Sequence, residues 1–471
     1  MPSTYLFYDI ETTGLNKCFD QVLQFAAIRT DLSLHELERY DMTVQLTSDV
    51  IPAPEAMITH RLRLSELALG RAELEVIREI HGLMNTPSTI SLGYNSLGFD
   101  DEFLRFSFYR HLLSPYTHQY AAQCQRMDLY PITVLYYLFK RDTLHWPHVD
   151  GKTNLQLAQL SKANHWSVGP AHRAISDAEA ALSLAHQLIQ ERTLWDDAVS
   201  HFDKKMEGHR YQQLSTVFTV GNKIYKEALL VQGQLGFDLC YQTPVLSLGQ
   251  HRHYKNQSLW LRLDTEQLQK TTLNDVASTT VILRKRAGEQ PLLLPTHRRF
   301  LMHLSHERQQ LALENKAWLQ AHPDVLQNIC DYYQHYQYPR WEHVDIDAAL
   351  YDLDFPTPHE EQLFQQFHKT PPQKKENIAK QFPNALRQQQ AIRLLGRYDP
   401  DALSAEGREQ WLSHLRDLHT TLTTCPTDYR GNPRLTVPTA ITQLTKLKTH
   451  HPLDAEQEAI LNELERYYRS L

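Results

Sequence analysis

Hydrophobic and polar positions along the first 192 residues predict strands and helices in alternation. Short apolar runs bounded by turn residues indicate strands at residues 5–10, 22–30, 41–46 and 89–93. Apolar residues at helical spacing indicate helices at residues 65–84, 103–113, 128–139, 153–164 and 175–189. Strands that alternate with helices predict an α/β layer domain with a mixed sheet.

A different pattern begins near residue 193 and predicts a second domain. Short β-like runs separated by Gly, Asn and Gln turns occur at residues 228–232, 236–241, 245–248, 258–263 and 278–284. Such runs are typical of a small barrel or sandwich. From about residue 349 the pattern is helical and repeatedly interrupted by proline. The sequence therefore predicts three domains, at residues 1–192, 193–348 and 349–471.

Length and composition indicate a folded protein with more than one core. The chain has 471 residues, of which 41% are hydrophobic and 10% are aromatic, and a single core rarely grows beyond about 250–300 residues. No apolar run reaches the roughly 18 residues of a membrane-spanning helix, and residues 1–4 carry no signal-peptide pattern. The five cysteines are scattered, without a Cys-x-x-Cys pair. We therefore expect a cytoplasmic protein that does not associate with membranes.

The net charge of −7 gives no support to a nucleic-acid-binding function, because such proteins usually carry a basic surface. For binding, however, the field along one groove matters more than the sum over the chain. In the second domain, several basic residues would suit a groove that follows phosphates, and several aromatic residues would suit base stacking. These are Arg252, Lys255, Arg284, Lys285, Arg286, Arg298 and Arg299, and Phe237, Tyr241, Tyr254 and Trp260. A solvated face and a barrel core are the competing interpretations.

Two carboxylates, Asp9 and Glu11, come at the end of the first predicted strand and carry the strongest chemical signal. In a strand, residues i and i+2 point to the same face, so these two side chains project together while Ile10 points the other way. Neighbouring carboxylates repel each other unless a cation lies between them, and oxygen ligands suit Mg²⁺ or Mn²⁺. Because Asp-x-Glu is common on protein surfaces, the pair alone is weak evidence.

Two later clusters place further acidic residues at element boundaries. Asp100 follows the strand predicted at 89–93 and comes where a loop enters a helix, so it is either a helix cap or part of a site. Asp177 comes in the first turn of the helix predicted at 175–189, with His172 in the loop before it. The alternatives here are an aspartate that complements the helix dipole and an exposed loop histidine. The three clusters together favour a metal site.

In this order and spacing, the clusters resemble the DEDD exonuclease superfamily in its His-containing variant. The family's motifs are Asp-x-Glu, Asn-x-x-x-Phe-Asp and His-x-x-x-x-Asp, and all three are present. The matching residues are Asp9, Glu11, Asn95, Phe99, Asp100, His172 and Asp177. Residues 25–31 and 160–164, and the length of the chain, are more similar to the bacterial exodeoxyribonuclease I family than to the shorter members of the superfamily.

The resemblance implies an RNase H-like exonuclease domain, an SH3-like β-barrel domain and a C-terminal α-helical domain. It implies processive 3′→5′ hydrolysis of single-stranded DNA to nucleoside 5′-monophosphates by a monomer, in DNA repair and recombination. It also implies binding to the acidic C-terminal tail of single-stranded DNA-binding protein. An exonuclease that acts on RNA, and a non-catalytic scaffold that binds single strands, stay open as alternatives.

The same resemblance assigns roles to individual residues. Four carboxylates would bind two Mg²⁺ ions, for which Mn²⁺ would substitute, and these are Asp9, Glu11, Asp100 and Asp177. His172 completes the catalytic set as the general base, because its pKa is ordinarily close to neutral pH. The substrate-binding residues would be Glu11, Thr12, Asn95 and Gln156. Exonuclease I proteins commonly have a basic residue where Gln156 stands, so a phosphate contact at that position would be weaker here.

Overall fold

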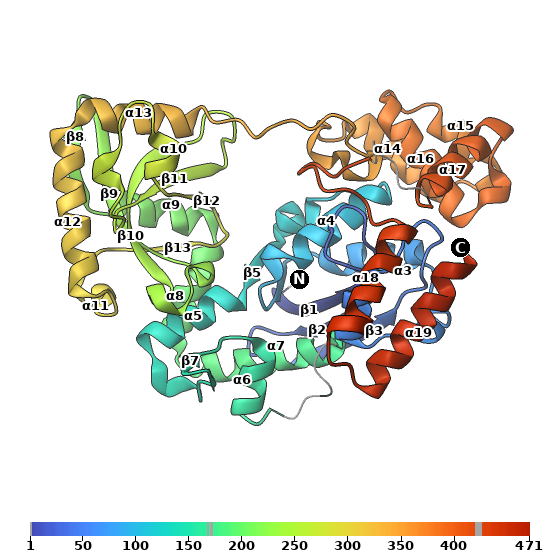
Figure 1. Cartoon of the computed structure of the whole chain (residues 1–471), viewed down its shortest axis with the longest axis horizontal. Coiled ribbons are helices and arrows are strands. Elements are labelled where there is room, and N and C mark those ends of the chain that lie inside the picture. Colours follow the sequence, from blue (N-terminus) through green and yellow to red (C-terminus); the bar gives the residue numbers. More distant parts are fainter. Residues whose placement is uncertain (1, 167–168, 170–172, 420–425) are drawn as a thin grey trace. The chain divides into compact units, whose positions relative to one another are not determined.

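The computed structural model describes residues 2–166, 169, 173–419 and 426–471. Within this range the chain forms two compact units, each built from more than one stretch of sequence (Figure 1). The first unit comprises Met1–Gln125, Val168–Glu179 and Arg340–Leu471, and the second comprises Arg126–Ser167 and Ala180–Pro339. Among the described residues, no helix combines the length and the apolar character that crossing a membrane requires.

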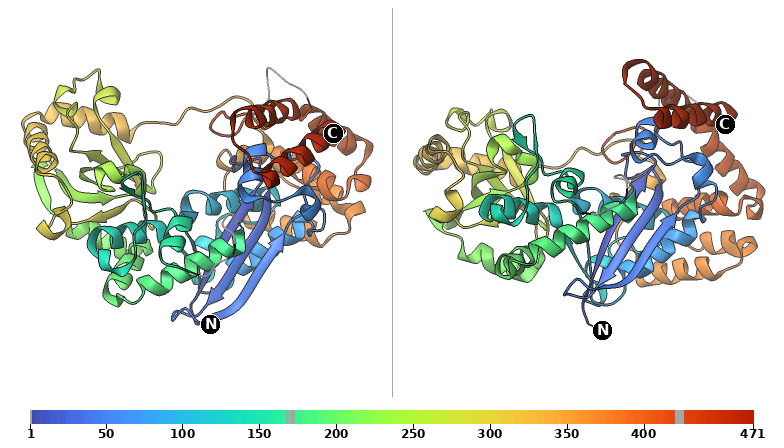
Figure 2. Two further views of the ribbon diagram at one scale, coloured as in Figure 1. Left: turned by 60° about the horizontal axis from the view of Figure 1, so that its bottom comes forward. Right: turned by 90° about the horizontal axis from the view of Figure 1, so that it is seen from below.

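A mixed five-stranded sheet is built around the first strand, β1 (Figure 2). In the order β3-β2-β1-β4-β5, its strands are β3 (Glu36–Thr43), β2 (Val22–Thr30), β1 (Thr4–Thr12), β4 (Thr89–Gly93) and β5 (Gln125–Asp128). β1 is antiparallel to β2 and parallel to β4, and β2 is antiparallel to β3. The mixed α/β sheet predicted from the sequence is therefore confirmed.

The strand predicted at 41–46 is wrong in position, because β3 begins at Glu36 and ends at Thr43. Its first four residues are exposed and three of them are charged, so this part of the strand carries no alternation of apolar and polar positions. The helix predicted at 65–84 is also divided, into α2 (Leu64–Leu67) and α3 (Glu73–Met84). Between them Gly70 passes so close to the backbone after β3 that a Cβ atom would lie 2.8 Å from the amide nitrogen of Gln45.

Helices α3 and α4 (Asp100–Arg110) contribute to one buried apolar cluster with β1, β2 and β3. This cluster contains Leu6, Tyr8, Ile10, Val22, Phe25, Ala27, Met42, Val44, Val76, Ile77, Ile80, Met84, Phe103, Leu104 and Phe108. Ile10 is among them, so the residue between the two carboxylates of β1 points into the core, as its position in the strand predicts. The burial of Ile10 fixes the face on which Asp9 and Glu11 project.

The helices α18 (Val437–His450) and α19 (Ala455–Ser470) share a core with α1 (Pro54–His60) in the first unit. The buried residues of this core include Met57, Ile58, Leu62, Val437, Ala440, Leu444, Ile460, Leu461, Leu464 and Tyr468. Asp454 and Gln457 form the capping box of α19 that their spacing predicts. Residues close to the C-terminus therefore pack directly beside the early part of the chain.

A buried ion cluster also links the C-terminal region to the loop before α1. Asp347 accepts hydrogen bonds from Arg393 and Arg397 at 3.0 and 2.6 Å. It accepts another from Arg434 at 3.1 Å, and Arg397 donates to Asp49 at 2.7 Å. Burial alone would raise the pKa of Asp347, but the charge of Arg397 and the other arginines holds it well below its ordinary value. Residues 374–397 form the most basic stretch of the sequence, and two of their arginines, Arg393 and Arg397, thus belong to this buried cluster.

One sheet of the second unit has six antiparallel strands in the order β12-β11-β10-β9-β13, with β8 also paired to β9. These strands are β8 (Thr216–Val220), β9 (Lys223–Val231), β10 (Gln242–Gln250), β11 (Gln257–Arg262), β12 (Ile282–Arg286) and β13 (Leu292–Leu294). No pairing among the described strands closes them into a barrel. The run predicted as a strand at 236–241 instead forms 3-10 turns, Gly233–Leu235 and Phe237–Leu239, around Gly236 at φ 75°.

The remaining described elements complete the two units. The helices are α5 (Leu129–Phe139), α6 (Leu157–Ala163), α7 (Ala174–Leu188), α8 (Arg192–Val199), α9 (Lys204–Gln213), α10 (Val276–Thr279), α11 (Arg298–Leu301), α12 (His306–Ala321), α13 (Pro323–Gln334), α14 (Pro358–Lys369), α15 (Pro372–Ala379), α16 (Ala385–Tyr398) and α17 (Ala405–Asp417). A short hairpin pairs β6 (His148–Val149) with β7 (Lys152–Thr153). The helical pattern predicted after residue 349 is therefore confirmed.

Candidate metal centre

Three carboxylates converge at the end of β1. Asp9 and Glu11 lie opposite Ala26 and Gln24 of β2 and project from the same face of the strand. Asp177 comes from the first turn of α7. Asp9, Glu11 and Asp177 each offer one carboxylate oxygen within 4.8 Å of the other two, so the structure brings together acidic residues that are more than 160 positions apart in the sequence.

Asp100, the fourth predicted carboxylate, begins α4 and is 7% exposed. The cap position of this helix is Phe99, and no side chain caps it, so the structure does not support the reading of Asp100 as a helix cap. Its charge instead contributes to raising the pKa of both Asp9 and Glu11. Asp100 therefore faces the same acidic cluster as the other three carboxylates.

The electrostatics of this cluster favour a bound cation. Burial, followed by the charges of Asp100, Asp177 and Glu11, raises the pKa of Asp9 well above its ordinary value. Burial and the charges of Asp177 and Asp100 raise the pKa of Glu11 to about 8, which Arg173 opposes. Without a cation, the carboxylates can stay close only by retaining protons. A donor set made of carboxylate oxygens suits hard divalent cations.

A second group of possible ligands does not favour a cation. Asp49, Asp347 and His414 also have potential ligand atoms within 4.8 Å of one another. Arg397 donates to both aspartates, at 2.7 and 2.6 Å, and Arg393 donates to Asp347 at 3.0 Å. Guanidinium groups therefore already supply the positive charge that a metal ion would bring.

The other residues singled out in the sequence lie in different surroundings. Thr12 follows Glu11 in β1, is buried, and donates its hydroxyl to the carbonyl of Gly14 at 2.7 Å. Asn95 is exposed in the turn after β4, with φ 62°, a conformation that asparagine adopts more readily than most residues. Gln156 is exposed in the second unit, where it precedes α6. His172 lies outside the described residues.

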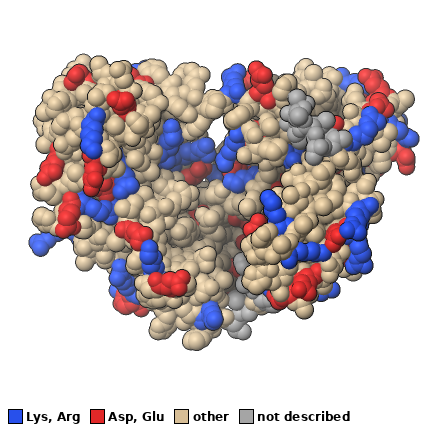
Figure 3. Space-filling view, in the orientation of Figure 1, with Lys and Arg blue, Asp and Glu red and all other residues tan. Residues whose placement is uncertain are grey.

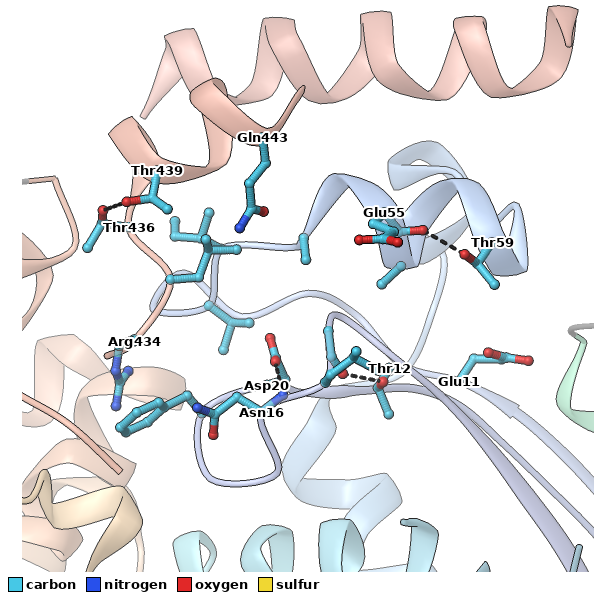
Figure 4. A pocket seen from close by; sticks show the side chains of 18 of the residues that line it. Glu11, Thr12, Asn16, Asp20, Glu55, Thr59, Arg434, Thr436, Thr439 and Gln443 are labelled. Carbon is cyan, nitrogen blue, oxygen red and sulfur yellow. Dashed lines mark hydrogen bonds between the residues drawn. The ribbon is translucent and has the colours of Figure 1, made fainter. Parts of the chain in front are cut away.

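A cavity of about 710 Å³ lies beside Glu11 and Thr12 in the first unit (Figure 4). Its walls are the loop after β1, helix α1 and the segment from residue 433 to 443. In Figure 4, Gln443 of α18 points into the cavity from one side, while Asn16 and Arg434 lie at the end away from Glu11. Apolar residues make up much of the wall, namely Ile10, Leu15, Phe19, Val50, Ile51, Ala53, Ala56, Phe99, Pro433 and Leu435.

No pattern in the sequence predicts the C-terminal wall of this cavity. Arg434 and Gln443 have no motif around them. Gln443 reaches the cavity because α18 packs on α1, and Arg434 is held beside it by hydrogen bonds to Asp345 and Asp347. Asn16 donates to the carboxylate of Asp428 at 3.1 Å, a contact between residues 412 positions apart. Contacts of this kind leave no local signal in a single sequence.

Comparison with known protein families gives two matches within the chain. Residues 6–185 match the family model described as Exonuclease, and residues 344–471 match the model described as Exonuclease I C-terminal domain. The curated relatives include exodeoxyribonuclease I of Escherichia coli strain K12, 33% identical over 207 residues, which are 43% of each chain. Exodeoxyribonuclease I of Haemophilus influenzae is 32% identical over 192 residues, 40% of each chain. The match thus spans less than half the length of these relatives.

Solved structures of the same name share the fold over the whole length. The structure described as Exonuclease I (apo) has a TM-score of 0.83 at 22% identity, and the match covers 100% of this chain and 99% of the other. E. coli Exonuclease I in complex with a dA16 oligonucleotide has a TM-score of 0.85 at 23% identity, covering 99% of both chains. A zinc-bound complex of E. coli ExoI with single-stranded DNA has a TM-score of 0.84 at 23% identity, covering 100% of this chain and 99% of the other. Residues 6–185 of the chain are therefore similar to the Exonuclease family and residues 344–471 to the Exonuclease I C-terminal domain, and the curated relatives similar to its first part include proteins named exodeoxyribonuclease I.

Proposed function

We propose that this protein is a divalent-metal-dependent 3′→5′ exonuclease that degrades single-stranded DNA to nucleoside 5′-monophosphates. The observation that carries the proposal is the convergence of Asp9, Glu11 and Asp177 to within 4.8 Å, with the charge of Asp100 acting on the same cluster. The exonuclease domain and the relatives named exodeoxyribonuclease I support the same reaction class. The oligonucleotide complexes among the solved structures support single-stranded DNA as the substrate.

The four carboxylates, Asp9, Glu11, Asp100 and Asp177, are the proposed ligands of two Mg²⁺ ions, with Mn²⁺ as a substitute. Two such ions, when bound, lower the pKa of the attacking water and neutralise charge on the phosphate and the leaving oxygen. The protein's part is to hold four acidic groups together on the rigid end of β1 and on the first turns of α4 and α7. A bound cation keeps these groups ionised, which reverses the proton retention expected without it.

His172 is the proposed general base, a role that rests on its place five residues before Asp177. A histidine ordinarily titrates near pH 6.5 and can accept a proton from water at neutral pH. His172→Ala should therefore slow hydrolysis at pH 7 but leave metal binding unchanged, whereas Asp177→Ala should weaken metal binding as well. A His172→Ala protein with the full turnover rate would exclude histidine as the base.

The cavity beside Glu11 and Thr12 is the proposed site of the 3′-terminal nucleotide. Its volume of about 710 Å³ falls in the range of roughly 300–1,000 Å³ typical of pockets for small organic ligands. Apolar walls suit the faces of a base, and Asn16, Thr59 and Gln443 offer hydrogen-bonding groups for its edge. Glu11 belongs to both the cavity and the acidic cluster, so a nucleotide in the cavity would have its phosphate next to the metal centre. Thr12, Asn95 and Gln156 stay predicted substrate contacts.

Several broader predictions also remain proposals. They are the three domains at 1–192, 193–348 and 349–471, the SH3-like character of the second, processive action by a monomer in DNA repair, and a cytoplasmic location. Binding of the acidic tail of single-stranded DNA-binding protein belongs with them, and it is supported by a relative described as SSB/Exonuclease I in complex with an inhibitor. Size-exclusion chromatography and titration with the tail peptide would test the oligomeric state and the partner separately.

A time course with 5′-labelled single-stranded DNA tests the central proposal. We expect a descending ladder in Mg²⁺ that disappears in EDTA and in Asp177→Ala. Asp401→Ala is the matched control, because its side chain is fully exposed and far from the acidic cluster in sequence. Shortening from the labelled end, or cleavage that survives EDTA, would contradict the proposal. A matched RNA strand decides whether the 2′-OH is tolerated, and no hydrolysis of either strand together with no binding of Mn²⁺ would favour the scaffold alternative.

A further inference from the structure

Lys17 connects two of the elements that carry the proposed metal ligands. It lies in the loop after β1, six residues beyond Glu11, and its ammonium donates to the carbonyl of Gly98 at 2.6 Å and to the carboxylate of Glu102. Gly98 precedes Asp100 by two residues and Glu102 follows it by two, so the lysine contacts the chain on both sides of that carboxylate. One side chain therefore ties the loop after β1 to the first turn of α4.

The ion pair between Lys17 and Glu102 is largely shielded from water. The side chain of Lys17 is 17% exposed and that of Glu102 is 15% exposed, and the ammonium also lies 5.9 Å from the ring centroid of Phe99. Over much of the face in Figure 3, acidic and basic side chains alternate on the surface, where water and salt screen an ion pair until it contributes little. A pair with little exposure is screened less, so this contact restrains its two elements more firmly than exposed pairs do.

Glu102 also anchors the C-terminal region. Its Oε1 atom accepts hydrogen bonds from the hydroxyls of Tyr429 and Tyr351, at 2.8 and 3.1 Å. The ring of Tyr429 stacks on Phe106 of α4, with centroids 5.7 Å apart and an angle of 8° between the planes. The guanidinium of Arg430 lies 3.8 Å from the same oxygen of Glu102. One carboxylate thus joins the loop lysine to residues 249 and 327 positions further along the chain.

These contacts bear on Asp100 because the helix that begins there is weakly capped. The side chain at its cap position is the phenyl ring of Phe99, which has no oxygen to accept from the first amides of the helix. The ends of helices fray, and the carboxylate of Glu102 in the first turn complements the positive end of the helix dipole. A first turn held through Glu102 keeps Asp100 in place as well.

We propose that Lys17 and Glu102 are positioning residues that hold Asp100 at the spacing from the two carboxylates of β1 that metal binding requires. Tyr429 acts as the C-terminal support of Glu102. The inference rests on the proposed function for the identity of the metal ligands. Replacing residues that orient metal ligands typically costs roughly 10–100-fold in metal affinity or activity. The C-terminal region thereby contributes to the metal centre without supplying a ligand to it.

Binding of Mn²⁺ to the full chain without DNA, followed by isothermal titration calorimetry, tests this role apart from hydrolysis. Lys17→Met keeps a long side chain but removes its charge and its donors, so it should raise the Kd of Mn²⁺ roughly tenfold. Lys17→Arg keeps a cation with several donors and should restore most of the affinity. Lys448→Met is the matched control and should bind Mn²⁺ as the wild type does. Lys448 pairs with Glu465 at 2.6 Å in the same unit, on α18, which carries no proposed ligand.

Steady-state hydrolysis separates a positioning role from contact with DNA. If Lys17 positions Asp100, Lys17→Met should need a higher Mg²⁺ concentration for half of its maximal rate, and its KM for single-stranded DNA at saturating Mg²⁺ should stay that of the wild type. If the ammonium instead binds a phosphate, KM rises at every Mg²⁺ concentration while the Kd of Mn²⁺ is unchanged, which would overturn the proposal. A loss of thermal stability with unchanged Mn²⁺ affinity would overturn it too, because the ion pair would then be structural only.

The C-terminal support is tested with Tyr429→Phe, which keeps the ring on Phe106 and removes only the hydroxyl that donates to Glu102. It should weaken Mn²⁺ binding by less than Lys17→Met does, since Tyr351 still donates to the same oxygen. Because both changes act through Glu102, their free-energy effects should not add in the double variant. An unchanged Kd in Tyr429→Phe, or strict additivity, would remove the C-terminal support from the proposal. The same variant carries the test if Lys17→Met does not fold.

The positioning role and the proposed function can fail independently. Because Mn²⁺ binding is measured without DNA, a protein that hydrolyses no nucleic acid but whose Lys17→Met variant binds Mn²⁺ less tightly would keep the positioning role and lose the nuclease. A protein that hydrolyses DNA and whose variants bind Mn²⁺ normally would keep the nuclease and lose the positioning role. A wild type that binds no Mn²⁺ would contradict both.

Discussion

Replacing Asp177 with asparagine should stabilise the metal-free protein, although it removes a proposed metal ligand. Burial, followed by the charges of Asp177 and Asp100, raises the pKa of Glu11 from 4.5 to about 8. The folded protein therefore holds this proton more tightly than the unfolded chain does. It follows that the contribution of Glu11 to stability is fully present below about pH 4.5 and is lost as the pH rises towards 8.

The size of the effect follows from the pKa. At about 1.4 kcal/mol for each pH unit, the unfolded chain, which loses this proton near pH 4.5, gains about 3.5 kcal/mol on the folded protein between pH 4.5 and pH 7, where the folded carboxyl is still protonated. Burial is the largest cause of this cost, and Asp177 is the larger of the two charges that add to it. Removing the charge of Asp177 lowers this pKa and should therefore recover about 1 kcal/mol at pH 8 for each unit by which the pKa of Glu11 falls, which corresponds to a rise of a few degrees at most in the unfolding temperature.

Thermal unfolding of the wild type and of Asp177→Asn in EDTA, at pH 5 and pH 8, measures this gain. We expect the variant to be more stable than the wild type mainly at the higher pH, and the order to reverse when Mn²⁺ is added, because the wild type binds the ion more tightly. Asp401→Asn, on the exposed surface, should change little in either condition. A variant that is less stable than the wild type in EDTA at pH 8 would refute the electrostatic reasoning.

Three further predictions concern stability alone. Asp347→Ala leaves buried arginines without their partner and should lower the free energy of unfolding, measured in urea, by roughly 3–5 kcal/mol. The control Asp401→Ala should change it little, and equal losses in the two variants would contradict the importance of the buried cluster. In Gly82→Ala the added Cβ has no atom within 4 Å, so this change should stabilise the protein by about 0.5–1 kcal/mol. Gly396→Ala would place its Cβ 2.5 Å from an indole ring and should destabilise the protein. Burial lowers the pKa of His201 from 6.5 to about 3, so the contribution of this histidine to stability is lost as the pH falls through this range. In His201→Phe, the free energy of unfolding should therefore fall less steeply with pH between 6.5 and 3. An unchanged pH dependence in this range would argue against a buried neutral histidine.

The sequence predicted best those elements whose residues share one environment. The bounds predicted for β2 and β4 are those of the structure, and every residue of β2 is buried. The sequence predicts a wrong position for β3 because the first residues of this strand face solvent, and a strand without a buried face has no apolar period. It predicts a strand at the 3-10 turns around Gly236 because aromatic residues such as Phe237 and Tyr241 favour strands when the backbone conformation is unknown.

The residues of the candidate site also differ in how strongly the local sequence marks them. Asp9, Glu11, Asp100 and Asp177 could be proposed from the sequence because local spacing and turn residues mark the last part of β1 and the first turns of α4 and α7. The cavity could not be identified, because Gln443 lines it only through the packing of α18 on α1. The face that a helix presents to a distant partner depends on the tertiary fold, which the pattern within that helix does not specify.

The position of α18 has a consequence for the order in which the protein is made. Residues 433–443 form one wall of the cavity beside Glu11, and they leave the ribosome long after the strand that carries the carboxylates. A nascent chain that stops short of these residues would hold its acidic residues beside a pocket with one side missing. The wall of this pocket is thus complete only after residues 433–443 have been synthesised, long after the strand that carries the carboxylates.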